Sequence, residues 1–102
     1  MGTDEFSVRG GIRVVPKLGG GVRAEAGWPM ARLRADRQSI RLRELWAGTL
    51  VISADNLIAI RLRRSTGLEF EVTDYDELWI FRSLSVDRVI GRLAALGWYA
   101  EL

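Results

Sequence analysis

The sequence predicts a mainly β protein, a barrel or sandwich of about seven antiparallel strands followed by one C-terminal helix at residues 85–96. Two patterns support this fold class. Apolar and charged residues alternate along residues 31–43 and 58–72, which is the period of strands with one buried face. Near the C-terminus the apolar spacing changes to every third or fourth residue, which is the period of a helix with one buried face.

The chain has 102 residues, enough for one domain with a single core. We expect residues 1–9 to form a flexible N-terminal segment and residues 10–102 to form the domain. The first predicted strand covers residues 12–15 and ends at Pro16. The glycines at 19–21 then predict a turn, because they lack the spacing of a phosphate-binding loop.

Residues 31–43, ARLRADRQSIRLR, predict a hairpin that contains five arginines. Residues 36–39 have the composition of a four-residue turn, and that length pairs Leu33 with Leu42 on the buried face. The same register places arginines opposite one another on the other face: Arg34 against Arg41 and Arg32 against Arg43. Like charges in such positions destabilise a hairpin by roughly 0.2–1 kcal/mol per pair. Hairpin stability therefore does not explain why these arginines face one another.

Residues 58–72 predict a second hairpin whose facing charges are opposite in sign. We expect its loop at residues 65–67, with Gly67 in the left-handed conformation that such a loop requires. Pairing across this loop sets Leu62 against Phe70 inside. Outside, it sets arginines against glutamates: Arg63 against Glu69 and Arg61 against Glu71. Like-charge pairing is therefore not a general property of this chain.

The remaining elements follow from shorter patterns. Residues 45–53 predict one or two short strands broken at Gly48, and residues 78–83 are apolar on both faces, which predicts a central strand. Residues 98–102 are expected to return as a strand or to pack as an apolar flap.

The C-terminal helix is expected to begin after Ser83 or Ser85 and to end at Gly97. Gly91 inside it predicts close packing against the sheet, because glycine costs a helix about 1 kcal/mol relative to alanine. The expected buried stripe is Val86, Val89, Ile90, Leu93 and Leu96.

Composition excludes several kinds of chemistry. Without cysteine or histidine, the chain has no thiol nucleophile, no Ser-His-Asp triad and no zinc site of the usual kind. The acidic residues 74–77 lack the spacing of a calcium-binding EF-hand loop. We therefore expect no enzyme activity, no catalytic residue, no metal site and no cofactor. No apolar run is long enough to cross a membrane and the N-terminus lacks a leader pattern, so we expect a cytoplasmic protein.

The charge is unevenly distributed along the chain. Residues 28–68 carry eight arginines and three acids, whereas residues 69–102 carry three arginines and seven acids. A genome that favours arginine codons would explain the excess of arginine but not this segregation. Such segregation is typical of a surface for an anionic partner, or of two faces that pair in an oligomer.

Several segments together resemble the small bacterial pleckstrin-homology-like (PH-like, GRAM-like) domains: GWPMARLRADRQSIRLREL, the Trp46-Ala47-Gly48 motif, LIAIRL, LWIF and VIGRLAALG. The resemblance covers roughly residues 28–97. It implies a barrel of about seven antiparallel strands, one end of which is closed by the C-terminal helix, and a scaffold for binding. It also implies that basic residues on the first hairpin bind phosphate-bearing ligands, and the arginines of 31–43 would lie there.

Two functions are consistent with these features. The first is a binding module for an anionic lipid, a phosphate-bearing ligand or an acidic protein surface. Arginine suits this role because its planar guanidinium forms two parallel hydrogen bonds with phosphate or carboxylate. The alternative is that these side chains only extend into water and cover the sheet. The expected binding residues are Arg32, Arg34, Arg37, Arg41 and Arg43.

The second function is homo-oligomerisation, in which the basic residues of 28–68 meet an acidic stretch of a neighbouring copy. We do not expect nucleic acid as a partner, because 31–43 contains no aromatic residue on which bases could stack. The residues expected to make the contact between copies are Glu69, Glu71, Asp74, Asp76, Glu77, Trp98 and Tyr99.

Overall fold

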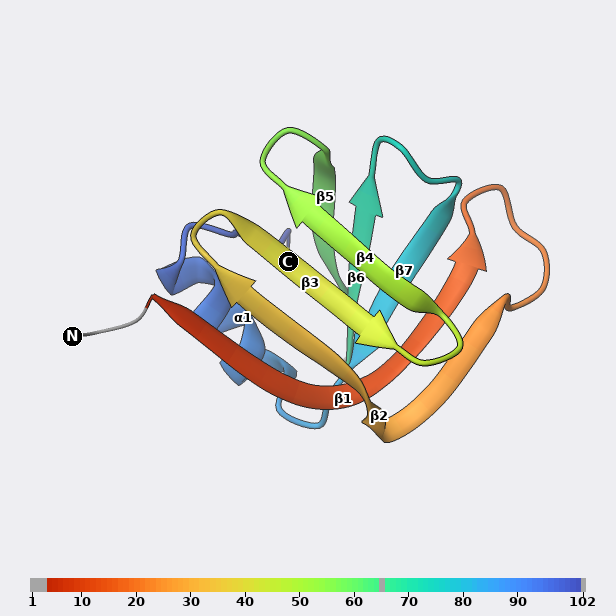
Figure 1. The fold of residues 1–102 in the computed structure, drawn as a ribbon, viewed down its shortest axis with the longest axis horizontal. Helices are drawn as coiled ribbons and strands as arrows, with labels where there is room; N and C mark the ends of the chain where they lie inside the picture. Colours follow the sequence, from red (N-terminus) through yellow and green to blue (C-terminus); the bar gives the residue numbers. More distant parts are fainter. Residues whose placement is uncertain (1–3, 65, 102) are drawn as a thin grey trace.

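The computed structural model describes residues 4–64 and 66–101, which form one curled sheet with a helix at one end (Figure 1). All strand pairings are antiparallel, in the order β4-β3-β2-β1-β7-β6-β5, so β4 and β5 lie at the ends of a sheet that is not closed. The predicted mainly β class with seven antiparallel strands and one C-terminal helix is confirmed. The elements are β1 (Glu5–Pro16), β2 (Ala24–Asp36), β3 (Ser39–Glu44), β4 (Gly48–Ser53), β5 (Leu57–Arg63), β6 (Gly67–Val72), β7 (Glu77–Arg82) and α1 (Val86–Ala95).

Strand β1 joins the two halves of the sheet. It pairs with β2 along most of its length, with a register shift between Gly10 and Ile12, and residues 11–16 also pair with β7. At this crossing β1 and β7 approach so closely that a Cβ on Gly10 would overlap the backbone carbonyl oxygen of Arg82 and lie 2.6 Å from Cζ of Phe81. Only glycine fits there, so Gly10 allows the sheet to bend around its core.

The N-terminal part of β1 corrects one expectation. The strand begins at Glu5, inside the segment 1–9 that we expected to be flexible, and Phe6 is only 7% exposed. Phe6 and Val8 pack against the core while Ser7 and Arg9 are exposed, which is the alternation of a strand. The expectation is therefore wrong for residues 5–9, and residues 1–3 lie outside the described part of the chain.

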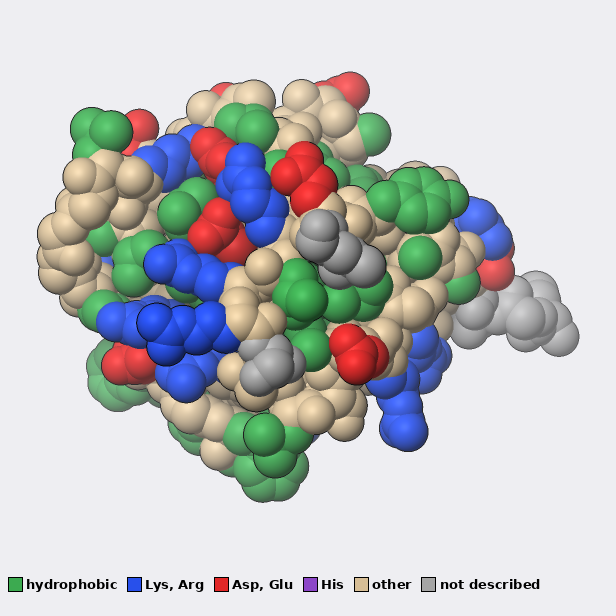
Figure 2. Space-filling view, turned by 180° about the vertical axis from the view of Figure 1, so that it is seen from behind, with side chains coloured by type: hydrophobic (Ala, Val, Ile, Leu, Met, Phe, Trp, Pro, Cys, Tyr) green, Lys and Arg blue, Asp and Glu red, His purple; other side chains and the backbone are tan. Residues whose placement is uncertain are grey.

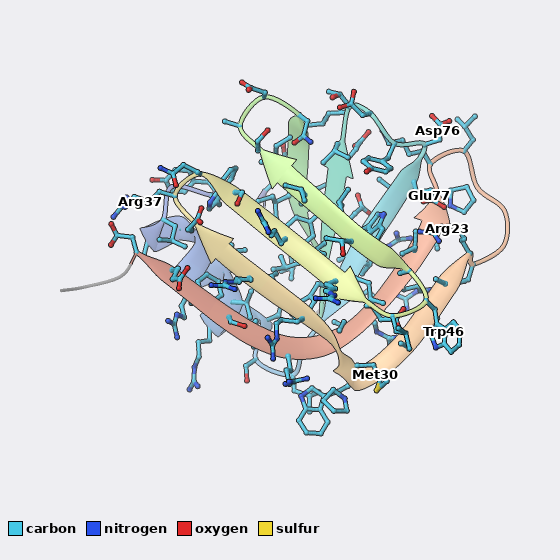
Figure 3. The ribbon with its side chains drawn as sticks, viewed as in Figure 1. Arg23, Met30, Arg37, Trp46, Asp76 and Glu77 are labelled. Atoms are coloured by element: carbon cyan, nitrogen blue, oxygen red, sulfur yellow. The ribbon has the colours of Figure 1, made fainter. Side chains whose placement is uncertain are left out.

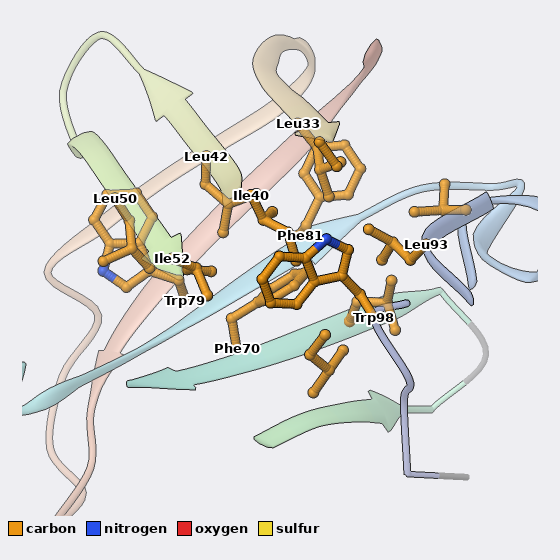
Figure 4. Packing of buried hydrophobic residues seen from close by; sticks show 14 of the residues in the cluster. Leu33, Ile40, Leu42, Leu50, Ile52, Phe70, Trp79, Phe81, Leu93 and Trp98 are labelled. Atoms are coloured by element: carbon orange, nitrogen blue, oxygen red, sulfur yellow. The ribbon is translucent and has the colours of Figure 1, made fainter. Parts of the chain in front are cut away.

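The core lies between the concave face of the sheet and α1 (Figure 4). Trp98 is part of it: the side chain is 6% exposed, and its indole N–H donates a hydrogen bond of 2.7 Å to the carbonyl of Asp36. The expectation that Trp98 contributes to a surface contact is wrong, because its ring fills the core. Glu101 returns to the edge of β5 as a bridge with Arg61.

Helix α1 buries Val86, Val89 and Leu93, as the spacing predicts, and the chain leaves it at Gly97 with a φ of 95°. Gly91 is exposed, with no heavy atom within 4 Å of a Cβ built on it. The expected close packing at Gly91 is therefore wrong, since this residue lies on the solvent side. No helix in the described ranges is long and apolar enough to cross a membrane.

The β5–β6 hairpin has a register two residues away from the predicted one: Leu62 pairs with Leu68. Gly67 is part of β6, opposite Arg63, and Arg64 takes the left-handed conformation with a φ of 58°. The expected left-handed conformation of Gly67 is therefore wrong. Close packing requires the glycine instead, because a Cβ there would lie 3.1 Å from Cγ2 of Ile80. Ser65, in the predicted loop, lies outside the described residues.

A register shift of two residues leaves the charged side chains of this hairpin on their predicted face. The predicted charge pairs therefore still form as diagonal contacts. Arg63 lies 3.0 Å from Glu69, and Arg61 lies 2.8 Å from Glu71.

Replacing glycine by alanine at two positions should change stability in opposite directions. Gly10→Ala should lower the free energy of unfolding by about 1–3 kcal/mol, because the added methyl group overlaps Phe81. Gly91→Ala should raise it by about 0.5–1 kcal/mol, because the helix gains a better helix former in open space. Urea denaturation measures both, and a stable Gly10→Ala variant would contradict the close crossing of β1 and β7.

Candidate functional site

Asp36 fixes the turn of the β2–β3 hairpin. Its carboxylate accepts hydrogen bonds of 2.8 Å from the backbone N–H groups of Gln38 and Ser39. The bonds from Ser39 and Gln38, with smaller contributions from the charges of Arg41 and Arg34, lower the pKa of Asp36. The turn therefore favours a charged carboxylate at neutral pH.

This turn sets the predicted register, which is confirmed: Leu33 pairs with Leu42. The four strand arginines are exposed on the convex side of the sheet. They form two like-charge pairs: Arg34 with Arg41, and Arg32 with Arg43.

The position of this hairpin in the fold differs from the expectation in one respect. It is the second hairpin of the sheet, because β1 and β2 form the first. The sequence did not reveal this, since the first half of β1 was expected to be flexible.

The structure adds Arg9 to the predicted site. Arg9 on β1 pairs with Arg32 on β2, which in turn pairs with Arg43 on β3. Three arginines therefore form one row across three adjacent strands. The alternation of Phe6, Ser7, Val8 and Arg9 could have revealed this strand. We call Arg9, Arg32, Arg34, Arg41 and Arg43 together the arginine face.

Acidic groups only partly neutralise the arginine face. Arg34 lies 3.5 Å from Glu5, and both side chains are exposed. Exposed pairs of this kind contribute about 0–1 kcal/mol. Arg32, Arg41 and Arg43 make no ion pair within the described ranges, 4–64 and 66–101. Arg9 reaches only the carbonyl of Pro29, at 3.5 Å. The face therefore has a net positive charge.

Arg37 does not share this face. It lies at the turn of the hairpin, where its guanidinium pairs with Asp4 at 2.8 Å. Figure 3 shows Arg37 at one end of the hairpin, with Met30 and Trp46 toward the other end. Met30 and Trp46 are exposed. Arginine, tryptophan and methionine are enriched where proteins contact one another, so this composition favours a macromolecular partner.

Most of the predicted acidic stretch is engaged within the chain. Glu69 is 8% exposed and lies 2.9 Å from Arg61 and 3.0 Å from Arg63. Glu71 contacts Arg61 and also Lys17, and the hydrogen bond from Arg61 is the main cause of its lowered pKa. Figure 2 shows acidic and basic side chains interleaved on this side of the molecule.

The other residues expected to contact a neighbouring copy differ in whether they already have a partner within the chain. Glu77 contacts Arg23, and the two lie together in Figure 3. Asp74, Asp76 and Tyr99 are exposed. Of the seven residues expected to contact a neighbouring copy, these three are the ones that remain accessible without a basic partner among the described residues.

A second group of basic side chains surrounds a hollow of about 440 Å³ on the outer side of β1 and β7. Most of these groups already have acidic partners: Arg82 and Arg13 contact Glu25, and Lys17 contacts Glu71. This hollow is therefore closer to neutral than the arginine face.

A comparison with models of known protein families and with curated proteins finds no match to this chain. Function therefore has to be inferred from the geometry. The feature that stands out is the arginine face, whose charge the chain itself leaves largely uncompensated.

The lowered pKa of Asp36 predicts a measurable dependence of stability on pH. Its contribution is complete above about pH 4, the ordinary carboxyl range, and is lost as the pH falls through the lowered value. The unfolding free energy of Asp36→Asn should therefore decrease less on acidification than that of the wild type, as measured by urea denaturation. Asp55→Asn, which removes a carboxylate from another exposed turn, is the control for the loss of one charge. An unchanged dependence in Asp36→Asn would contradict the role of this carboxylate.

Proposed function

We propose that this protein is a non-enzymatic binding module whose arginine face docks onto an extended anionic surface, such as an acidic segment of another protein. The observation that carries the proposal is the row formed by Arg9, Arg32 and Arg43 on three adjacent strands, none with an ion pair among the described residues. Like charges in this arrangement destabilise the free protein, and an anionic partner would relieve the repulsion.

The layout of the face favours an extended partner over a single small ion. Neighbouring strands lie about 4.8 Å apart, so the row offers several guanidinium groups side by side. The two hollows of about 440 and 900 Å³ are not lined by Arg32, Arg34, Arg41 or Arg43. A long anionic segment can contact several such groups at once, each by two parallel hydrogen bonds. The resemblance to PH-like domains also supports a binding role.

A second candidate is self-assembly, in which the arginine face meets the acidic stretch of a neighbouring copy. The exposed Asp74, Asp76 and Tyr99 favour it. It has less support because Glu69, Glu71 and Glu77 already contact basic groups of their own chain.

Removing two arginines from the central row should weaken binding to a polyanion. Arg32→Gln/Arg43→Gln should bind poly-L-glutamate about fivefold more weakly than the wild type at low salt, because each exposed ion pair contributes about 0.2–1 kcal/mol. Added salt should weaken the binding of the wild type to poly-L-glutamate more than that of the variant. Titration calorimetry measures both, and polyphosphate in place of poly-L-glutamate tests whether carboxylates are preferred.

The matched control is Arg13→Gln/Arg64→Gln, which removes the same charge from exposed positions outside the arginine face. It should retain at least half of the wild-type affinity. Equal losses in the two double variants would mean that net charge alone attracts the polyanion, and the proposal would fail.

Light scattering separates the two candidates. The binding module should remain monomeric at high protein concentration in both low and high salt. Self-assembly instead requires an oligomer that salt dissociates and that Asp74→Asn/Asp76→Asn abolishes. That result would replace the first proposal by the second.

A further inference from the structure

The larger of these two hollows lies away from most of the arginine face, between the first half of β1, the start of α1 and residues 27–28 of β2. Its volume is about 900 Å³, within the range of sites that hold small molecules. Its apolar lining comes from three elements and the turn before α1: Phe6, Val8, Trp28, Leu84 and Val89.

The path of the backbone creates this hollow. Strand β7 pairs with β1 only from Gly11 onward, so the edge of β1 before Gly11 has no β7 partner. Gly11 and Gly27 line the hollow without side chains to fill it. A Cβ on Gly11 would lie 2.8 Å from the carbonyl oxygen of Ala26, so the backbone there is tightly packed. The crossing of β1 therefore forms one wall of this space.

Two large apolar side chains at this site face water. Trp28 is 74% exposed and Leu84 is 98% exposed. Figure 2 shows apolar side chains projecting at the lower edge of the molecule, with basic side chains on both sides of them. An apolar group that entered the hollow would cover both residues, which favours binding through the hydrophobic effect.

The charges around the hollow have one sign. Four arginines line it and no acidic residue does: Arg9, Arg82, Arg88 and Arg92. Arg82 already contacts Glu25, so the positive charge comes from the other three. The guanidinium of Arg92 lies over the ring of Phe6, 4.8 Å from its centre, which holds it at the wall. Arg88 makes no ion pair within the part of the chain that the structure describes. The lining therefore complements a ligand that is both apolar and negatively charged.

We infer that this hollow binds a small anionic amphiphile, that is, a molecule with an apolar body and one carboxylate or phosphate head. The body would contact Trp28 and Leu84, and the head would lie against Arg88 and Arg92. A free inorganic anion would leave the apolar surface uncovered, and an uncharged apolar molecule would leave the arginines without a partner. This site is separate from the proposed function, and only Arg9 borders both.

The probes for the test are decanoate, decanol and inorganic phosphate, titrated below the concentration at which decanoate forms micelles. Nuclear magnetic resonance of the 15N-labelled full chain reports the location, because of its four tryptophans only Trp28 lines the hollow. Decanoate should shift the indole signal of Trp28 and the amide signals of Leu84 and Arg88. Decanol and phosphate should each bind at least tenfold more weakly.

Two exposed substitutions test the two parts of the site without disturbing the core. Arg88→Glu should weaken decanoate binding about tenfold, because it removes a charge-assisted hydrogen bond and adds a repulsive charge. Leu84→Ser should weaken both decanoate and decanol. Arg43→Glu makes the same charge change on the arginine face and should leave decanoate binding unchanged, while it weakens binding to poly-L-glutamate.

Three results would overturn the inference. Decanoate that shifts Trp46 as much as Trp28 would indicate nonspecific adsorption to exposed apolar groups. Equal affinity for decanol would remove the role of the arginines, and so would unchanged decanoate binding in Arg88→Glu. Each of these leaves the proposal for the arginine face intact, since that proposal is tested with poly-L-glutamate and Arg43.

Discussion

The approach of β1 to β7 at Gly10 is the contact on which the rest of the fold depends. It lets one long strand serve both halves of the sheet, so that the sheet curls around a single core that α1 and Trp98 complete. The same crossing has two consequences for the surface. It extends β1 alongside β2, which adds Arg9 to the row of Arg32 and Arg43, and it leaves the edge of β1 before Gly11 open, where the apolar hollow forms.

The β5–β6 hairpin pairs opposite charges on its exposed face, whereas the β2–β3 hairpin pairs like charges. In β5–β6, Arg61 and Arg63 contact Glu69 and Glu71, and the pairs stabilise the hairpin locally. In β2–β3, arginine faces arginine, and stability has to come from elsewhere: the buried face and the hydrogen bonds that Asp36 accepts at the turn. A hairpin that remains stable despite its surface charges leaves those charges available to a partner.

Local pattern was enough to predict the β2–β3 register and the buried side of α1, because a turn of fixed length and a helical stripe both depend on nearby residues. Contacts between distant residues were not predictable. Gly67 and Gly10 are glycines because another strand passes close to them, and Gly91 has open space around it, yet nothing in the sequence distinguishes the three. Trp98 was expected at the surface because its burial depends on where the helix ends over the sheet. Arg9 was missed because its pairing with Arg32 connects residues far apart in the chain.

The central claim is that the arginine rows destabilise the free protein and are retained for an anionic partner. The most direct test is the free energy of unfolding of Arg43→Gln against the wild type, measured by urea denaturation at low and high salt without any ligand. If the claim holds, the substitution stabilises the protein by about 0.2–1 kcal/mol at low salt, and the gain disappears at high salt as the repulsion is screened. A substitution that destabilises the protein at low salt would mean that Arg43 serves the fold itself, and would contradict the claim.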